Sequence, residues 1–223
     1  MQIVYEDTIG VNVPNNLYLM VQDYTQNTEA SFVFHIPSFV ELAEERIYNT
    51  VQIPALRKSV TGSVTTGIPY LGLPTDYLAP FAMSVIDPVT SAQSFMLNKD
   101  VEYIRQSFPT PVSIGQPTHY AQFDTVSFIL GPTPDQTYTI ELHYYYYPQS
   151  IVNTNISWLG NNASNVLLYG TLREAYLYMK GEQDMVQYYE QKYQEGIQML
   201  KDLSEGKGRR DTYRSGQIRI APT

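Results

Sequence analysis

Apolar residues near the start of the chain recur at helical spacing between the breaker Pro14 and the polar stretch TQNTEAS. This pattern predicts a short helix over residues 16–24. The positions that set the period are Leu17, Met20, Val21 and Tyr24.

A second helical pattern follows in IPSFVELAEERIYNTV. Pro37 suits the first turn of a helix, and Ser38 and Glu41 have the spacing of a capping box, so we expect this helix over residues 36–50. Its apolar stripe consists of Val40, Ala43, Ile47 and Val51. The opposite side carries Glu41, Glu44 and Glu45, which we interpret as an ordinary solvated face.

Between about residues 53 and 149 the period changes to short runs rich in Val, Thr, Ile and Tyr, separated by Gly and Pro. These runs predict an antiparallel β-domain, interrupted by one short helix near residues 99–107. The segment GPTPDQ, with Gly131, Pro132 and Pro134, is predicted to be a hairpin loop between the last two strands. The strand runs are IPALRKSVTGSV, GIPYLGL, YLAPFAMSVID, SFMLN, TVSFIL and TYTIELHYYYY.

Helical spacing returns after Pro148 and predicts two antiparallel helices, over residues 164–179 and 183–203, separated at Gly181. The first apolar face consists of Leu167, Leu168, Leu172, Ala175, Tyr176 and Met179. The second consists of Met185, Val186, Tyr189, Tyr193, Ile197 and Leu200, and we interpret its later positions as core. The last segment has no usable period and predicts an extended tail.

The sequence therefore predicts an α+β fold, an α-helical bundle with an inserted antiparallel β-domain and an extended C-terminal tail. The expected divisions are residues 1–52 (N-terminal segment and bundle helices), 53–149 (β-domain), 150–206 (C-terminal bundle helices) and 207–223 (tail).

Four consecutive tyrosines end the last predicted strand, in ELHYYYYPQS. Because strand side chains alternate between faces, Tyr144 and Tyr146 share one face with Leu142, whereas Tyr145 and Tyr147 share the other. Both faces are thus aromatic. One interpretation is a strand covered on both sides within its own domain, and the other is a strand whose outer face meets another subunit.

The composition and motifs of the chain argue against several kinds of functional site. The chain has no cysteine, which excludes disulfides and thiolate sites, and His35, His119 and His143 lie far apart, so no metal site is expected. No nucleophile elbow, phosphate-binding loop or paired-carboxylate motif occurs, and we expect neither an enzyme nor a bound cofactor. The start, MQIVYEDTIG, lacks the features of a signal peptide and no run is long enough to span a membrane, so we expect synthesis in the cytoplasm and no membrane contact.

Charge is unevenly distributed along the chain. Residues 1–206 hold nine Lys and Arg against 21 Asp and Glu, a net charge of −12, whereas residues 207–223 hold five against one, a net charge of +4. An acidic body with a basic tail is typical of proteins that bind a partner through the tail, although basic tails are also commonly just solvated.

The order of these parts carries a resemblance. FVELAEERIYNTVQIPAL, LPTDYLAPF, HYYYYP, WLGNNASNVLLYGTLREAYLYMKGE and RRDTYRSG, in this order over residues 15–216, resemble the head-to-tail adaptor of tailed bacteriophages, called tail tubular protein A in short-tailed phages. The resemblance implies a structural virion protein at the head–tail junction. It implies a ring, usually of twelve copies, between the portal and the tail nozzle, with a C-terminal tail that grips the portal.

The expected contacts follow from this resemblance. Portal binding falls on the tail, and a ring would place Tyr145 and Tyr147 at subunit contacts. An acidic inner wall would let packaged DNA pass without specific binding. The tail residues expected at the portal are Arg209, Arg210, Tyr213, Arg214, Ile218 and Arg219.

Two other functions stay open at this point. Exposed tyrosines of the β-domain could stack on a ligand in a carbohydrate- or peptide-binding module. Alternatively, the basic residues around Tyr213 could follow a nucleic-acid backbone.

Overall fold

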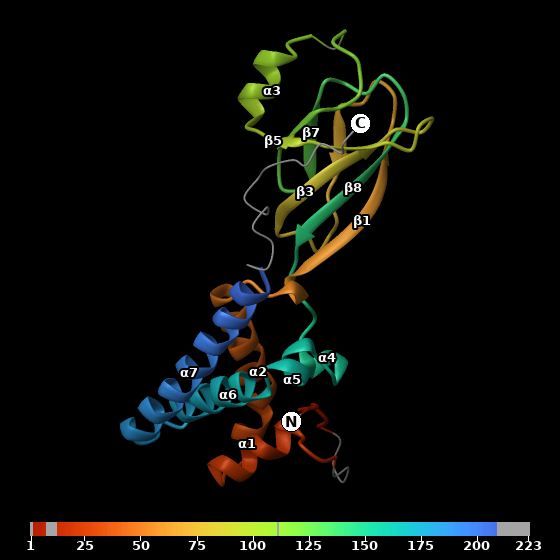
Figure 1. The fold of residues 1–223 in the computed structure, drawn as a ribbon. Coiled ribbons are helices and arrows are strands. Elements are labelled where there is room, and N and C mark those ends of the chain that lie inside the picture. Colours follow the sequence, from red (N-terminus) through yellow and green to blue (C-terminus); the bar gives the residue numbers. More distant parts are fainter. Residues whose placement is uncertain (1, 8–12, 111, 209–223) are drawn as a thin grey trace. The chain divides into compact units, whose positions relative to one another are not determined.

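The structure is a computed structural model, and it describes residues 2–7, 13–110 and 112–208. Its contacts divide the chain into two compact units, Met1–Ala55 with Pro148–Thr223 and Leu56–Tyr147. We call the first the helical unit and the second the β unit (Figure 1). The predicted α+β class is confirmed.

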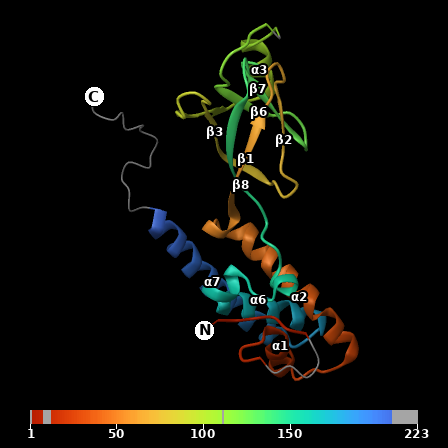
Figure 2. The ribbon, with the colours of Figure 1, turned by 90° about the vertical axis from the view of Figure 1, so that its right-hand side faces the viewer.

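Seven helices are described, six of them in the helical unit. Those of the helical unit are α1 (Leu17–Thr25), α2 (Ala30–Thr50), α4 (Ile151–Thr154), α5 (Trp158–Asn162), α6 (Ser164–Tyr178) and α7 (Gln183–Gly208). α6 packs against both α2 and α7, as the predicted bundle requires, and Figures 1 and 2 show α6 and α7 side by side. The later apolar positions of α7 are buried in this bundle, which confirms their interpretation as core: Tyr189, Tyr193, Ile197 and Leu200.

The second helix begins earlier than predicted. α2 starts at Ala30, so Pro37 lies inside the helix and not in its first turn, and the proposed capping box of Ser38 and Glu41 is wrong. Phe32 and Ile36 are buried and extend the apolar stripe toward the N-terminus. Burying this longer stripe favours the extra turns, although Pro37 lacks one main-chain donor.

Two successive residues, Lys180 and Gly181, shape the turn between α6 and α7. Lys180 takes a left-handed φ of 53°, and the N–H of Gly181 donates to the Tyr176 carbonyl. A Cβ at Gly181 would lie 2.8 Å from the Tyr176 ring, so a larger residue would displace that ring. Gly181 therefore permits the close return that makes the two helices antiparallel.

The β unit contains two four-stranded sheets. The first has the order β1-β8-β3-β4 and is antiparallel throughout; the second has the order β2-β7-β6-β5, with one parallel pair, β5 and β6. The strands are β1 (Arg57–Val64), β2 (Tyr70–Gly72), β3 (Ala79–Ile86), β4 (Gln93–Phe95), β5 (Leu97–Asn98), β6 (His119–Gln122), β7 (Ser127–Gly131) and β8 (Tyr138–Tyr145). A single turn of 3-10 helix, Pro54–Leu56, precedes β1.

Inner side chains of the two sheets share one core, which includes Met83, Leu142 and Tyr144 from the first sheet and Phe128 and Leu130 from the second. The predicted short helix is confirmed as α3 (Val101–Ser107). Ile104 on α3 packs with Ala121 and Ile129 of the second sheet in a smaller cluster. The second sheet is therefore covered on both faces.

The predicted hairpin at GPTPDQ is wrong. β7 and β8 flank this segment, but they belong to different sheets and do not pair. β8 pairs with β1 and β3 instead, so the proline-containing segment carries the chain from one sheet to the other. Gly and Pro predict where strands stop, but they do not fix which strands pair.

Candidate interaction surfaces

β8 places the tyrosine run as the alternation predicted. Tyr144 is buried in the core between the sheets, with Tyr146 partly buried against it. Tyr145 is half-buried on the outer face of the first sheet, and Tyr147 follows the strand with 43% of its surface exposed. The run therefore serves both interpretations, because its inner tyrosines form core and its outer ones remain accessible.

Tyr145 belongs to a small cluster on this outer face. Its ring centroid lies 5.7 Å from that of Phe81 in an edge-to-face arrangement, and Phe81 is 50% exposed. The Arg57 guanidinium lies 4.4 Å from the Phe81 centroid and 5.7 Å from that of Tyr145. Large rings beside a stacked arginine are typical of protein contact sites.

A polar strip continues across the same face. Gln93 donates to the Ser84 hydroxyl at 2.8 Å and to Glu141 at 2.6 Å, and His143 Nε2 lies 3.2 Å from the other Glu141 oxygen. These bonds hold together side chains from β3, β4 and β8. In this arrangement Ser84 accepts from Gln93, and His143 pairs with Glu141.

Asp76 ties the inner tyrosine to the edge of the sheet. Its two carboxylate oxygens accept from Lys58 Nζ at 2.6 Å and from the Tyr144 hydroxyl at 2.7 Å. The bond from Lys58, followed by that from Tyr144, lowers the pKa of Asp76. Asp76 therefore links Lys58 of β1 to Tyr144 of β8.

Glu44 is the residue of the helical unit whose position differs most clearly from the one predicted. We predicted it on a solvated face, which is wrong, because only 2% of its surface is exposed. Its Oε1 accepts the Ile151 N–H at 3.1 Å, at the start of α4. Burial raises the pKa of Glu44, opposed by the hydrogen bonds from Ser150 and Ile151.

A cluster of charges joins three helices of the bundle. Glu190 on α7 accepts from Arg46 on α2 at 2.9 Å and lies 2.6 Å from Arg173 Nε on α6. Arg173 also pairs with its neighbour Glu174, and Arg46 stacks over the Tyr193 ring at 4.7 Å. The cluster aligns α2, α6 and α7, and these charges pair with one another within the helical unit.

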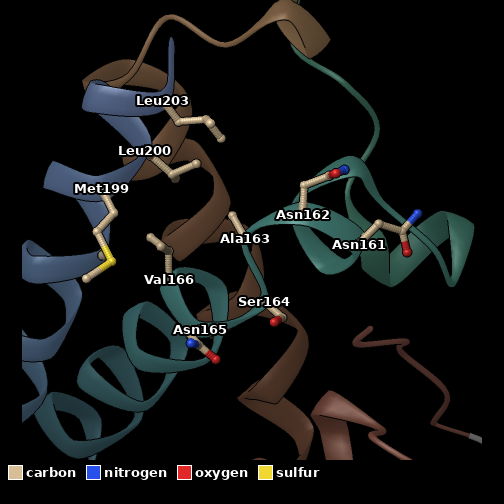
Figure 3. Close-up of a pocket in the computed structure, with 10 residues that line it drawn as sticks. Asn161, Asn162, Ala163, Ser164, Asn165, Val166, Met199, Leu200 and Leu203 are labelled. Atoms are coloured by element: carbon tan, nitrogen blue, oxygen red, sulfur yellow. The ribbon is translucent and has the colours of Figure 1, made fainter. Parts of the chain in front are cut away.

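A groove opens between the start of α6 and the end of α7 (Figure 3). It has a volume of about 320 Å³, and its apolar side is formed by Val166, Leu200, Met199 and Leu203. Met199 is 72% exposed and Leu203 is 45% exposed. Exposed apolar side chains that gather at a groove mark a surface suited to another protein.

Three further expectations concern metal binding, membrane insertion and the portal-binding residues. The described residues bring together no set of His, Cys, Asp or Glu side chains able to hold a metal ion. Within the described ranges, every helix is too short or too polar to cross a bilayer. The expected portal-binding residues, from Arg209 to Arg219, lie outside the described residues.

Comparison with known proteins gives one family. The family model described as SU10 adaptor protein matches residues 17–220, a range that includes the β unit and most of the helical unit. A comparison with curated protein sequences finds no match. Since the family model spans most of the chain, this protein belongs to the SU10 adaptor protein family and is a phage adaptor, a component of the virion that interacts with portal and tail proteins.

Proposed function

We propose that this adaptor assembles into a ring that joins the portal to the tail nozzle. The observation that carries the proposal is the family match over residues 17–220, which spans the β unit and most of the helical unit, including most of the C-terminal segment. A dodecamer is the copy number we propose. Its subunits are made in the host cytoplasm and function at the head–tail junction.

Ring closure requires each subunit to offer two different surfaces, one to each neighbour. The helical unit supplies the groove at Met199 and Leu203 and, on another helix, the exposed apolar side chains Phe34 and Leu42 of α2. The β unit supplies the outer cluster that contains Tyr145, with Tyr147 beside it. We assign subunit contacts to these surfaces.

We assign portal binding to the segment after Gly208, whose basic residues suit carboxylates of the portal. The body that remains is acidic, with a net charge of −12 over residues 1–206. An inner wall with this charge repels packaged DNA, so that the DNA passes during ejection without binding.

Electron microscopy of the purified protein mixed with its portal tests this function. We expect a ring stacked under the portal, and a matched sample without portal shows whether the ring forms alone. A protein that stays monomeric with portal present, and that does not co-sediment with it, would contradict the proposal.

A further inference from the structure

The long edge of the first sheet is the feature on which this inference rests. β1 forms one edge of that sheet and pairs with β8 along its whole length, Arg57–Val64. It has eight residues, whereas the other three sheet edges, β4, β2 and β5, have three, three and two. Proteins commonly protect sheet edges by keeping them short, bulged or covered, and β1 is a long edge without a bulge.

The hydrogen-bond register shows which groups of β1 are free. The N–H of Tyr146 donates to the Leu56 carbonyl at 2.9 Å, and in an antiparallel ladder such bonds recur at every second residue. Even-numbered residues of β1 therefore bond to β8. The N–H and C=O groups of Ser59, Thr61 and Ser63 point away from β8, and no described residue hydrogen-bonds to them.

An apolar slot lies beside this edge, on the inner side of the sheet. It has a volume of about 270 Å³ and separates β1 from the end of β2. Gly62 and Gly72 have no side chain that would fill the slot. The space beside each is open, since a Cβ at either position would meet no atom within 4 Å. Its apolar walls include Val60, Leu71, Leu73, Ile140 and Leu142.

The side chains at the start of β1 indicate which charge a bound segment would carry. Lys58 is already paired with Asp76 at 2.6 Å. Arg57 stacks on Phe81 and Tyr145 and forms no ion pair with a described residue. A carboxylate that arrives near Arg57 would therefore find an unpaired guanidinium.

We propose that β1 is a docking edge for an extended segment of another junction protein, which adds as a fifth strand to the first sheet. The segment carries apolar side chains at every second position, directed into the slot, and a carboxylate opposite Arg57. Main-chain bonds to Ser59, Thr61 and Ser63 supply the attachment, and the slot supplies selectivity.

A second copy of this chain fits the edge less well. Pairing of β1 with β1 of a second copy is a twofold contact, which joins two subunits and does not close the proposed ring. The remaining sheet edges of the described residues have at most three residues, too few to pair along β1. An occupant that matches the length of β1 must come from another segment, and we assign it to a different protein. This assignment rests on the proposed function, which places partner proteins on both sides of the adaptor.

The variant Thr61→Pro separates an effect on docking from an effect on folding. Proline at this position removes an N–H that points outward and leaves the ladder with β8 intact, whereas Val60→Pro would remove a bond to β8. Thr61→Ala keeps the N–H and is the matched control. We expect Thr61→Pro to remain folded by circular dichroism and to weaken partner retention in purified particles by about tenfold or more, with Thr61→Ala unchanged.

Hydrogen exchange on the wild-type protein provides a second measurement, independent of any variant. In the free protein, the amides of Ser59, Thr61 and Ser63 should exchange fast while those of Val60 and Gly62 exchange slowly. In purified particles all five should be slow. Fast exchange at the outward amides in particles that contain the protein would overturn the docking edge.

The occupant is identified by cross-linking. The chain has no cysteine, so Ser59→Cys gives a single attachment point for a photoreactive maleimide. A cross-link to another virion protein supports the assignment, whereas a cross-link to a segment of this same chain overturns it. Absence of the protein from particles would instead refute the proposed function, and the protein bands of the particles show this separately.

Discussion

The Glu44 carboxylate of α2 accepts the main-chain N–H of Ile151 at 3.1 Å, a bond between residues 107 positions apart in the chain. Glu44 lies in the helix that precedes the β unit, and Ile151 begins the first helix after it. The bond therefore links the part of the helical unit that precedes the β unit in the chain to the part that follows it. Its buried carboxylate also makes the stability of this unit depend on pH.

Glu44→Gln should remove that dependence. Burial raises the folded-state pKa of Glu44 above its unfolded value, so the folded protein holds the proton more tightly. Its stabilising contribution is then complete below the unfolded pKa and is lost as the pH rises through the folded one. We expect the melting temperature of Glu44→Gln to gain on wild type as the pH rises from 4 toward 7, measured by calorimetry.

Glu44→Ala is the contrasting variant, because it leaves the buried Ile151 N–H without an acceptor. We expect a loss of about 1–3 kcal/mol in the free energy of unfolding. Equal stability of the Ala and Gln variants at pH 7 would contradict a role for this hydrogen bond.

Ile197→Asp should unfold the helical unit. Ile197 is buried in the stripe of α7, and an aspartate there would be buried without a partner at a cost of several kcal/mol. Gln187→Asp, at an exposed position of the same helix, is the control and should melt close to wild type. Thermal denaturation followed by circular dichroism measures both, and a wild-type melting temperature for Ile197→Asp would refute the bundle core.

Alanine at both Tyr145 and Tyr147 should weaken ring assembly more than it weakens the subunit. Loss of Tyr145 removes a partner of Phe81 and Arg57 from the exposed cluster, while the buried Tyr144 stays in place. Thr139→Ala, at an exposed position of the same strand, is the control. Analytical ultracentrifugation should show fewer rings; unchanged rings from a subunit that melts early would show that these tyrosines serve the fold.

Polar substitution in the groove tests the helical contact in the same assay. Met199→Ser with Leu203→Ser removes exposed apolar surface and should lower ring formation while leaving the melting temperature within a few degrees of wild type. Gln198→Ser, at an exposed position beside Met199, is the control. A normal yield of rings from the double variant would show that neighbours do not use the groove.

Deletion of residues 209–223 should leave the fold intact and abolish portal attachment. The deleted segment carries four arginines against one aspartate, and we expect the arginines to supply charge-assisted bonds to portal carboxylates. Co-sedimentation with portal measures the loss. Restoring the segment with Arg209, Arg210, Arg214 and Arg219 changed to Gln separates charge from apolar contact, and wild-type attachment by the truncated protein would eliminate the prediction.

Periodicity predicted the parts of this fold that depend on a single element. The α7 stripe is amphipathic over several turns, and the alternation of β8 distinguishes Tyr144 from Tyr145 without knowledge of any neighbour. The identity of the family was likewise predicted, because the order of the helices and the β-domain is a property of the chain itself.

Pairings between distant segments were not predictable in this way. Glu44 has the sequence context of a surface residue, and only the arrival of Ile151 explains its burial. The strand β6 was missed, since HYAQ is short and lies among turn residues. The groove at Met199 and Leu203 was also missed, although two apolar residues on the polar side of a helix could have indicated it.

The Tyr146 N–H donates to the Leu56 carbonyl at 2.9 Å, a bond between the first residue of the β unit and the residue before its last one. The chain therefore enters and leaves the β unit at neighbouring points, so the β unit is a module whose two chain ends meet. Evolution can exchange or enlarge such a module without rebuilding the bundle, since the bundle needs only two nearby chain ends to continue. Related adaptors could in this way keep one helical scaffold while they acquire different tail partners.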